Sequence, residues 1–557
     1  MNYPVVSGAD ALFTYGSDGA VAGRLCGDRI GIRFETAMGC TLVLHMGSIY
    51  KIEYECVLPD WISGKAYCQR GEVEFEIIAM APQEVYVSAS ENAEIRLMFD
   101  GDAVCEGGKE VRTYICNGET AALCISKKDG ISVGFSMGFG CAEKARDIVS
   151  QDIKIRREAL RRRYSSVALP RGISGRYEQV YRRCLALAEG SISTDGDRKA
   201  FAGRTAHGLC INSRQSMLAA VGLKKLFPEL ALSTVMYLVD FIDEKGILPA
   251  NISGGFPDGG CAAPLLPWAF CEIAGDSKSA VKQCYEALRR HVMYFISERD
   301  MNKNSLYHWL AGGKHNPGID SGMENSPRFD ENVIVDAPDL GAYLYMSIDA
   351  MCRMSKLINE NNDVLYWNVM AERVRLGVND FLFDEADKFY YDRGVIGKKL
   401  NKIKTVAGFM PVFGGICPPV RLNGLIECMS DKNTFGAKFG IPSAARNGKT
   451  YISDMYRGAV YFEENYKIAY GLCKAGKRDK AAEIVSRCLE AACRGYETAG
   501  VIYEYYSPAS TADNACQKRN GSGGGSMSLY GYNTCRRDCP VSAAFLVAMI
   551  ELLSNED

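Results

Sequence analysis

The sequence predicts a mainly α-helical protein, an (α/α) toroid preceded by an antiparallel β-sandwich. Up to about residue 142, apolar and polar residues alternate in short runs separated by turn signals, which is typical of half-buried strands. From about residue 143 onward, apolar residues recur every three to four positions, as on the buried face of a helix. A chain of 557 residues is also too long for one ordinary core, so an accessory domain is expected.

The strand prediction depends on clear period-two runs. Val73, Phe75 and Ile77 alternate with three glutamates. Residues 131–139 alternate in the same way with Ser and Gly, and residues 41–45 and 95–99 have similar patterns. Gly-Asp and Asn-Gly pairs between such runs indicate turns. We therefore predict an antiparallel β-sandwich over residues 1–142.

The remaining chain reads mostly as helices, often in pairs joined by short Gly or Pro breaks. The helical stretches expected are residues 213–244, 264–297, 336–381, 454–494 and 537–554. We predict a helical linker over residues 143–172 and the toroid over residues 173–557. A plain α-helical repeat protein is the alternative on pattern alone, although no fixed repeat length is present.

Composition narrows the function classes. A formal charge of −2 gives no electrostatic reason to bind nucleic acid or an anionic membrane. The start of the chain has no basic and apolar leader, and no apolar run could span a bilayer. The 22 cysteines are scattered, as free thiols in a reducing cytoplasm would be. We expect a cytoplasmic protein without membrane or nucleic-acid partners, and a homo-oligomer stays open.

Some local motifs favour no chemistry in their context. Residues 134–138 match Gly-x-Ser-x-Gly, but the serine lies within an alternating strand instead of a strand-to-helix turn. The Gly/Ser run at residues 521–526 lacks the ending of a phosphate-binding loop, so a flexible loop is expected, with a lid as the alternative. The chain has five histidines, and His308 and His315 have no carboxylate in ligand spacing. We therefore expect no metal and no cofactor.

Three segments concentrate polar residues where loops are expected. Residues 320–330 hold four charged residues, a Gly and a Pro. Residues 456–458, Tyr-Arg-Gly, are expected to open a helix that continues through residues 465 and 466. Residues 503–508, Tyr-Glu-Tyr-Tyr-Ser-Pro, embed an acid among aromatic rings. Aromatic faces stack on sugars, and glycoside hydrolysis needs two carboxyl groups flanking the scissile bond. The pattern indicates a small carbohydrate as substrate.

At these segments the chain resembles the clan of inverting (α/α)6-barrel hydrolases, namely glycoside hydrolase family 63 and the related family 37 trehalases. Residues 321–328 (Ser-Gly-Met-Glu-Asn-Ser-Pro-Arg) look like the clan's Ser-Gly-Met-Asp-Asn-Ser-Pro-Arg, whose Asp is the general acid. Residues 503–508 resemble the segment that carries the general base. Residues 440–443 (Gly-Ile-Pro-Ser), followed by 456–458, and residues 246–249 (Gly-Ile-Leu-Pro) are similar to further motifs, in the same order.

The resemblance implies an (α/α)6 toroid barrel with Glu324 as general acid and Glu504 as general base. An inverting enzyme should hold its two carboxyl groups about 6.5–9.5 Å apart, with room for the attacking water. Burial would keep Glu324 protonated. The resemblance favours an α-glucoside or an α-mannoside, of short-oligosaccharide or glycosyl-glycerate type, cleaved by an exo-acting enzyme.

Departures from the clan's pattern leave parts of the site open. Glu324 replaces an Asp and is one methylene longer, and Asp320 is the nearest alternative acid. Residues 212–216 occupy the place of a Trp-Asp substrate-contact motif but lack both residues, and Tyr461 stands where a Trp is usual. The remaining predicted substrate contacts are Trp268, Trp309, Asp320, Asn325, Arg328, Tyr456, Arg457 and Tyr505. For Trp268, packing in the core is an equally expected role. For Arg328 and Arg457, a structural ion pair is an equally expected role.

Two other functions fit parts of the pattern. A glycoside phosphorylase on a similar barrel would use phosphate in place of activated water, and it would not need the second carboxylate. A carbohydrate-binding protein that has lost catalysis would bind sugar without turnover. A helical scaffold for protein partners gives no reason for the aromatic cluster around Glu504.

Overall fold

The computed structural model describes most of the chain. The described residues are 5–6, 12–15, 21–26, 29–34, 40–45, 49–58, 61–81, 84–99, 101–127, 130–165, 167–195, 198–205, 208–253, 256–312, 318–499, 502–509, 535 and 539–554. They divide into two compact units, one made of Met1–Thr194, Cys493–Ile502 and Arg537–Ala543, and the other of the remaining residues. The predicted domain limits at residues 142 and 172 stay predictions. The Gly/Ser run at 521–526 lies outside the described residues.

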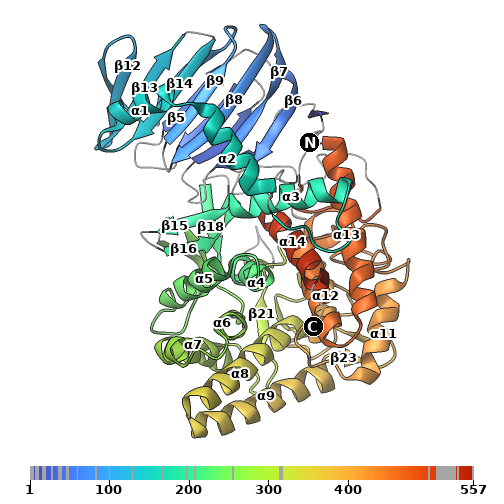
Figure 1. Cartoon of the computed structure of the whole chain (residues 1–557). Coiled ribbons are helices and arrows are strands. Elements are labelled where there is room, and N and C mark those ends of the chain that lie inside the picture. The colour runs from blue at the N-terminus through green and yellow to red at the C-terminus, as the bar shows by residue number, and fades with distance from the viewer. Residues whose placement is uncertain are drawn as a thin grey trace. The chain divides into compact units, whose positions relative to one another are not determined.

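The first unit contains two antiparallel sheets, as the alternating patterns predict (Figure 1). The nine-stranded sheet has, in spatial order, β1 (Val5–Val6), β6 (Ile49–Leu58), β7 (Trp61–Cys68), β8 (Gly71–Ala81), β9 (Glu84–Ala89), β14 (Ile131–Met137), β13 (Glu119–Ser126), β12 (Val111–Cys116) and β11 (Val104–Gly107). The five-stranded sheet has β10 (Glu94–Phe99), β5 (Cys40–His45), β4 (Arg29–Phe34), β3 (Val21–Cys26) and β2 (Leu12–Tyr15).

Alternation along the strands explains how this unit packs. Phe75 and Ile77 of β8 share one core with Leu42 and Leu44 of β5, so the two sheets form a sandwich. The next residue, Ile78, points to the opposite face, where it packs with residues of α1 (Cys141–Ser150) and α2 (Ile153–Ser165). Both faces of the nine-stranded sheet are therefore covered, one by the second sheet and one by helices.

This helical cover accounts for two details of the sequence. Glu76 is buried where alternation alone would expose it, because it accepts hydrogen bonds from Trp61 Nε1 and from Arg157 of α2. A Cβ at Gly134 would lie 2.1 Å from the carbonyl oxygen of Ala145 in α1, so this glycine permits close helix-to-strand packing. The Gly-x-Ser-x-Gly match, residues 134–138, is thus the second half of β14 and the residue that follows it, and not a nucleophile elbow.

Helices dominate the second part of the chain, in agreement with the predicted stretches. They are α3 (Arg176–Glu189) of the first unit, then α4 (Ser213–Leu223), α5 (Pro228–Asp240), α6 (Leu266–Ala274), α7 (Lys278–Glu298), α8 (Pro338–Ile358), α9 (Asn361–Phe381), α10 (Met410–Phe413), α11 (Pro419–Ser430), α12 (Phe462–Lys474), α13 (Arg478–Ala499) and α14 (Pro540–Ser554). Local signals set their ends: the side chain of Asn212 caps α4, Pro228 begins α5, and Asn359 ends α8 in a left-handed conformation. Neighbouring helices pack as antiparallel pairs, for example α8 against α9 (Figure 1).

Short strands and 3-10 turns connect these helices. The strands are β15 (Ile192–Asp195), β16 (Arg198–Phe201), β17 (Gly203–Thr205), β18 (Gly208–Asn212), β19 (Pro249–Ser253), β20 (Phe256–Cys261), β21 (His308–Leu310), β22 (Ile334–Asp336), β23 (Phe383–Asp384), β24 (Phe389–Tyr390) and β25 (Arg393–Gly394). The 3-10 turns are η1 (Ile319–Ser321), η2 (Pro327–Phe329), η3 (Val406–Phe409) and η4 (Met455–Arg457). The closure of the helices into an (α/α)6 barrel stays a prediction.

One helix prediction is wrong in detail. Residues 456–458 do not open a helix: η4 ends at Arg457, Gly458 has a φ of +157°, and α12 begins only at Phe462. The intervening residues are thereby available for backbone pairing with another segment.

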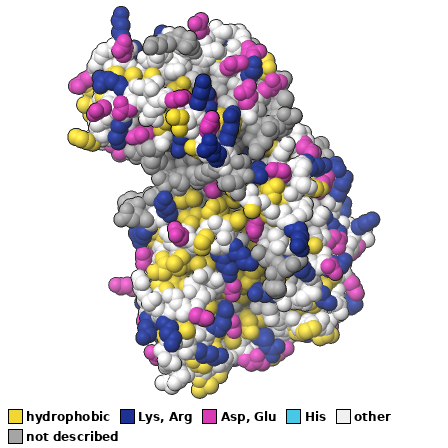
Figure 2. Space-filling view, viewed as in Figure 1, with side chains coloured by type: hydrophobic (Ala, Val, Ile, Leu, Met, Phe, Trp, Pro, Cys, Tyr) yellow, Lys and Arg dark blue, Asp and Glu magenta, His cyan; other side chains and the backbone are white. Residues whose placement is uncertain are grey.

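Among the described residues, no helix has both the length and the hydropathy needed to cross a bilayer. On the face shown in Figure 2, Lys and Arg side chains are interspersed with Asp and Glu.

Candidate active site

Glu324 lies in the 318–330 loop, between two buried neighbours. Met323 and Asn325 are 1% and 2% exposed, whereas Glu324 is half-buried. Asn325 has a φ of +65°, a left-handed conformation that asparagine tolerates better than most residues. The turn is closed by Ser326 N–H, which donates to the carbonyl of Met323 at 3.1 Å. Glu324 therefore lies in a closed turn between two buried neighbours, and its own side chain is only partly buried.

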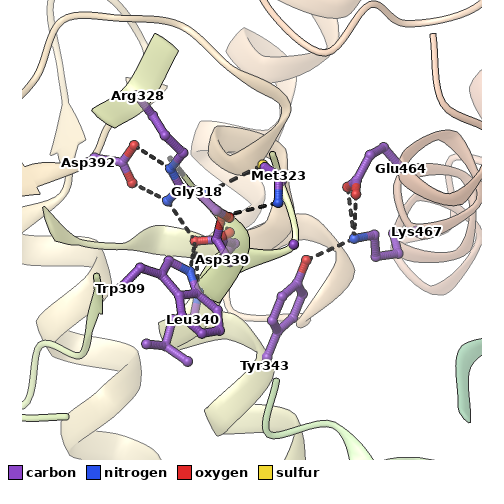
Figure 3. A network of polar contacts seen from close by, with 12 residues as sticks. Trp309, Gly318, Met323, Arg328, Asp339, Leu340, Tyr343, Asp392, Glu464 and Lys467 are labelled. Atoms are coloured by element: carbon purple, nitrogen blue, oxygen red, sulfur yellow. Dashed lines mark hydrogen bonds and ion pairs between the residues drawn. The ribbon is translucent and has the colours of Figure 1, made fainter. Parts of the chain in front are cut away.

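Arg328 is the buried anchor of this loop. Its side chain is fully buried, and all five N–H donors are engaged: Nε and Nη2 donate to Asp392, Nη1 and Nη2 donate to Asp339, and Nη1 also approaches Met323 Sδ at 3.5 Å. Figure 3 shows the guanidinium between the two carboxylates. No donor remains for a sugar hydroxyl. The placement of Arg328 favours the structural ion pair over its predicted role in substrate binding.

The two carboxylates that hold Arg328 differ in their surroundings. Burial acts to raise the pKa of Asp339, but Arg328, Trp309 Nε1 and the Leu340 N–H all donate to this carboxylate, and they hold the pKa below its ordinary value. Burial raises the pKa of Asp392 to about 6, because Arg328 offsets only part of the cost and Asp339 repels the charge. Asp339 is therefore the firmly ionised partner.

A second arginine, Arg457 of η4, holds the other side of the loop. Its Nε donates to Asn325 Oδ1 at 3.1 Å, next to Glu324. Both of its terminal nitrogens donate to the carboxylate of Asp330, one of them at 3.0 Å. Arg457 is only 5% exposed. The structure thus joins the predicted residues Asn325 and Arg457 to each other, as a clamp on the loop.

Asp320, the alternative acid, is tied to Arg299. The two guanidinium nitrogens of Arg299 donate to its two oxygens at 2.8 and 3.0 Å, and Leu310 N–H donates at 3.0 Å. With both oxygens engaged, Asp320 is poorly placed to give a proton to a glycosidic oxygen. Among the two acids considered at this end of the loop, the geometry therefore favours Glu324.

Glu504 lies in the 503–508 segment, whose neighbouring rings are buried. Tyr503, Tyr505 and Tyr506 are 2%, 0% and 1% exposed, whereas Glu504 is half-buried. Tyr506 pairs with Val460 through two backbone hydrogen bonds of 2.8 and 3.0 Å. This pairing uses the extended residues between η4 and α12, which explains why the helix could not begin at residue 456.

Aromatic stacking connects the same two segments. Tyr506 stacks on Phe462 with ring centroids 4.6 Å apart. Tyr461 stacks on Tyr456 at 4.1 Å, nearly parallel, and contacts Tyr505 at 5.3 Å. Tyr456 and Tyr505 are thus joined through Tyr461, which the sequence singled out only as a departure from Trp. Residues 456–461 contact the 318–330 loop through Arg457 and the 503–508 segment through Tyr461 and Val460.

The predicted tryptophan platforms are core residues. Trp309 is 0% exposed and donates from Nε1 to Asp339 at 3.1 Å (Figure 3). Trp268 is 4% exposed and packs edge-on against Phe413 and Tyr470. For Trp268 this agrees with the packing alternative, and for Trp309 it leaves no free face for a sugar.

Other motif segments act as packing points. Asn465 of α12 accepts from Ile441 N–H at 2.8 Å and donates to the Ile441 carbonyl at 3.1 Å, which fixes residues 440–443 against the start of α12. Gly246 has a φ of +87°, and a Cβ there would lie 2.2 Å from the carbonyl oxygen of Arg290 in α7. A glycine at this position is therefore required by a close approach of two backbones.

The sequence did not identify a buried charged cluster beside the loop. It consists of Arg214 of α4 with Glu463, Glu464 and Lys467 of α12, each at most 8% exposed. Tyr343 of α8 accepts from Lys467 Nζ at 3.0 Å (Figure 3). The signal in the sequence is the presence of three charged residues within five positions at the start of α12, a helix whose other residues are mostly apolar or aromatic. No group of three or more His, Cys, Asp or Glu side chains among the described residues is placed to hold a metal.

Comparison with known proteins decides the family. Residues 212–526, more than half of the chain, match the model of the mannosylglycerate hydrolase MGH1-like glycoside hydrolase domain. The chain belongs to this family. The match confirms the resemblance to glycoside hydrolase family 63 that the motifs predicted.

Two solved structures share the fold of about two thirds of this chain. A family 63 mannosylglycerate hydrolase from Thermus thermophilus, in complex with glucose, aligns with a TM-score of 0.51 at 18% identity, over 66% of this chain and 99% of that one. An uncharacterized conserved protein from the same organism gives 0.52 at 17% identity, over 67% and 99%. At these identities the two neighbours establish similarity of fold.

A curated relative matches part of the chain. An uncharacterized protein of Borreliella burgdorferi is 27% identical over 258 residues, which is 44% of this chain and 51% of the relative. The chain thus spans about half the length of the curated relative it matches.

Proposed function

We propose that this member of the MGH1-like glycoside hydrolase family cleaves an α-linked glucoside or mannoside with inversion, as an exo-acting enzyme. The substrate class is a short oligosaccharide or a glycosyl-glycerate, in line with the mannosylglycerate hydrolase named among the similar structures. We infer a cytoplasmic location from the 22 cysteines scattered along the sequence, which suit a reducing compartment.

In the proposed mechanism, Glu324 in its protonated form gives its proton to the leaving glycosidic oxygen. Glu504, ionised, takes a proton from a water molecule, and that water attacks the anomeric carbon from the opposite face. The C–O bond to the leaving group breaks as the C–O bond to water forms. One water is consumed and the two carboxyl groups exchange protonation states, which solvent then restores.

One observation carries the proposal: residues 456–461 join both carboxylate-bearing segments. Arg457 contacts Asn325, next to Glu324, while Tyr461 contacts Tyr505, next to Glu504. Each glutamate is half-buried between buried neighbours. Hydrolysis by two carboxyl groups requires that both are held in fixed positions. Here both lie on firmly held backbone, and one segment contacts the two stretches that carry them.

The test is turnover of a panel of α-glucosides and α-mannosides with detection of the product anomer, for wild type, Glu324→Gln and Glu504→Gln. Each variant should lose about 10²–10⁴-fold in kcat, and wild type should release product of inverted configuration. Glu331→Gln, an exposed glutamate just after the loop, is the matched control and should retain activity.

Each outcome bears on a separate part of the proposal. Full activity in either glutamine variant would remove that residue from the mechanism. Product of retained configuration would exclude inversion. Turnover that requires inorganic phosphate would favour a phosphorylase, and binding of sugar without turnover by wild type would favour a protein that has lost catalysis.

A further inference from the structure

Arg214 contacts the 318–330 loop at Gly322, a residue without a side chain. It lies in the first turn of α4, which Asn212 caps. A Cβ on Gly322 would be 2.6 Å from Nη2, 2.7 Å from Cζ and 2.9 Å from Nε of Arg214. The guanidinium therefore lies against the Gly322 backbone, and Nη2 approaches the Gly322 carbonyl oxygen at 3.5 Å. Gly322 has a φ of +71°, two residues before Glu324.

The guanidinium is held from the other side by α12. Nη1 of Arg214 donates to Glu463 Oε1, and Gln215 Nε2 donates to Glu463 Oε2 at 3.2 Å. Arg214 Nη1 also lies 3.7 Å from Glu464 Oε1. The guanidinium is thus held by α12 on one side and by the Gly322 backbone on the other.

The charges of this cluster balance. Lys467 Nζ lies 2.9 Å from Glu464 Oε1, 2.8 Å from Glu464 Oε2 and 3.5 Å from Glu463 Oε1. Burial acts to lower the pKa of Arg214, but the negative charge of Glu463 in particular raises it above its ordinary value. Two acids and two bases in one buried cluster keep Arg214 charged and in place without a solvent-exposed counterion.

We propose that Arg214 is a positioning residue for the general acid. By packing on Gly322, it fixes the backbone position of the loop that carries Glu324. The inference rests on the proposed function. A rigid, planar side chain packed on a glycine fixes backbone position more tightly than a flexible one. A carboxyl group that must reach a glycosidic oxygen is sensitive to small displacements of the backbone that carries it.

A direct role in substrate binding is the competing explanation for Arg214. Residues 212–216 occupy the place of a substrate-contact motif, but Arg214 is 8% exposed, and its terminal nitrogens point to Glu463 and to the Gly322 carbonyl. A substrate contact would act on KM, whereas a positioning residue acts on kcat for leaving groups that need a proton.

The experiment compares leaving groups in Arg214→Met and Arg214→Lys. With a sugar or alkyl leaving group, we expect Arg214→Met to lower kcat about 10- to 100-fold with little change in KM. With a dinitrophenyl leaving group, which departs without protonation, the rate should stay close to wild type. Arg214→Lys should recover only part of the loss. Arg157→Met, which removes the ion pair to Glu76 in the first unit, is the matched control.

A second pair of variants covers the case that Arg214→Met does not fold. Gly322→Ala places a methyl group against the guanidinium of Arg214. Gly415→Ala is the control, because Gly415 has the same φ of +71° but has open space where the methyl group would lie. We expect the leaving-group dependence in Gly322→Ala and not in Gly415→Ala.

The results separate this inference from the proposed function. Equal losses for all leaving groups, or a change in KM alone, would overturn the positioning role of Arg214. If Glu324→Gln itself shows no leaving-group dependence, the assignment of the acid fails instead. If Glu324→Gln shows it and Gly322→Ala and Arg214→Met do not, only the inference on Arg214 is wrong.

Discussion

The two glutamates are held by opposite kinds of chemistry. The 318–330 loop is fixed by arginines: Arg328 from beneath, Arg457 beside Asn325 and Arg214 against Gly322, each of them also paired with at least one carboxylate. The 503–508 segment is fixed by stacked rings and by the backbone pairing of Tyr506 with Val460.

The difference has physical consequences. Buried ion pairs tolerate the loss of one partner poorly, because the other charge stays behind without solvent. Where stacked rings and backbone hydrogen bonds hold a segment, the loss of one group lowers the free energy of unfolding by a smaller amount, and its effect is local. The position of Glu324 should therefore respond to charge removal and to pH, and the position of Glu504 should respond mainly to changes in shape.

The largest effect is expected for Arg328→Met. Asp339 and Asp392, both buried, would lose their common counterion, at a cost of about 3–5 kcal/mol in the free energy of unfolding. Chemical denaturation followed by tryptophan fluorescence would measure it, because three of the four tryptophans, Trp268, Trp309 and Trp367, lie in the second unit. Arg375→Met, which removes a largely exposed ion pair on α9, should change stability by less than about 0.5 kcal/mol. Equal effects of the two variants would contradict the contrast between buried and exposed pairs.

Asp392→Asn tests the pH response of the loop. The folded pKa of about 6 exceeds the ordinary value near 4, so the contribution of Asp392 to stability is complete below about pH 4 and is lost as the pH rises through about 6. Asparagine has no proton to lose. The stability deficit of Asp392→Asn relative to wild type should therefore shrink between about pH 3.5 and 7.5, by an amount on the order of 2–3 kcal/mol.

Asp339→Asn provides the control of opposite sign. The lowered pKa of Asp339 means that its contribution is present above the ordinary pKa and is lost only in acid. The deficit of Asp339→Asn should persist at neutral pH and shrink on acidification. Denaturation curves for both variants across the pH range would decide, and parallel pH profiles would show that the two carboxylates are not distinguished.

The same contrast explains what the sequence could predict. Periodicity predicted the β-sandwich and the helix pairs because burial in strands and helices repeats with backbone geometry. The motif segments were located, but their roles were not. Arg328 and Trp309 were predicted to contact substrate, because residues in a polar loop show no periodic pattern that would reveal their burial. Only the fold brings Asp339 and Asp392 to Arg328. Arg214 and Glu463 are 249 positions apart, so nothing local linked them.

Arg457→Lys should have an intermediate effect. Lysine keeps the charge but cannot bridge both oxygens of Asp330 while it donates to Asn325. We expect a loss of stability on the order of 1–2 kcal/mol and a lower kcat with leaving groups that need protonation. Steady-state kinetics with sugar and dinitrophenyl leaving groups would show it, and an unchanged ratio between the two would mean that the clamp does not act on Glu324.

The smallest effect is expected on the aromatic side, for Tyr506→Phe. The hydroxyl of Tyr506 accepts from Tyr503 N–H at 3.0 Å, while the ring itself stacks on Phe462 and the backbone pairs with Val460. Removal of the hydroxyl leaves the ring and the backbone pairing in place, so the cost should be about 1 kcal/mol, independent of pH in the range where Asp392 titrates. Activity should be nearly retained for every leaving group, because the groups that set Glu504 are preserved. A loss as large as that of Arg457→Lys, or one that follows pH, would mean that the 503–508 segment is held by polar contacts as the 318–330 loop is, and the contrast between the two carboxylate settings would then be lost.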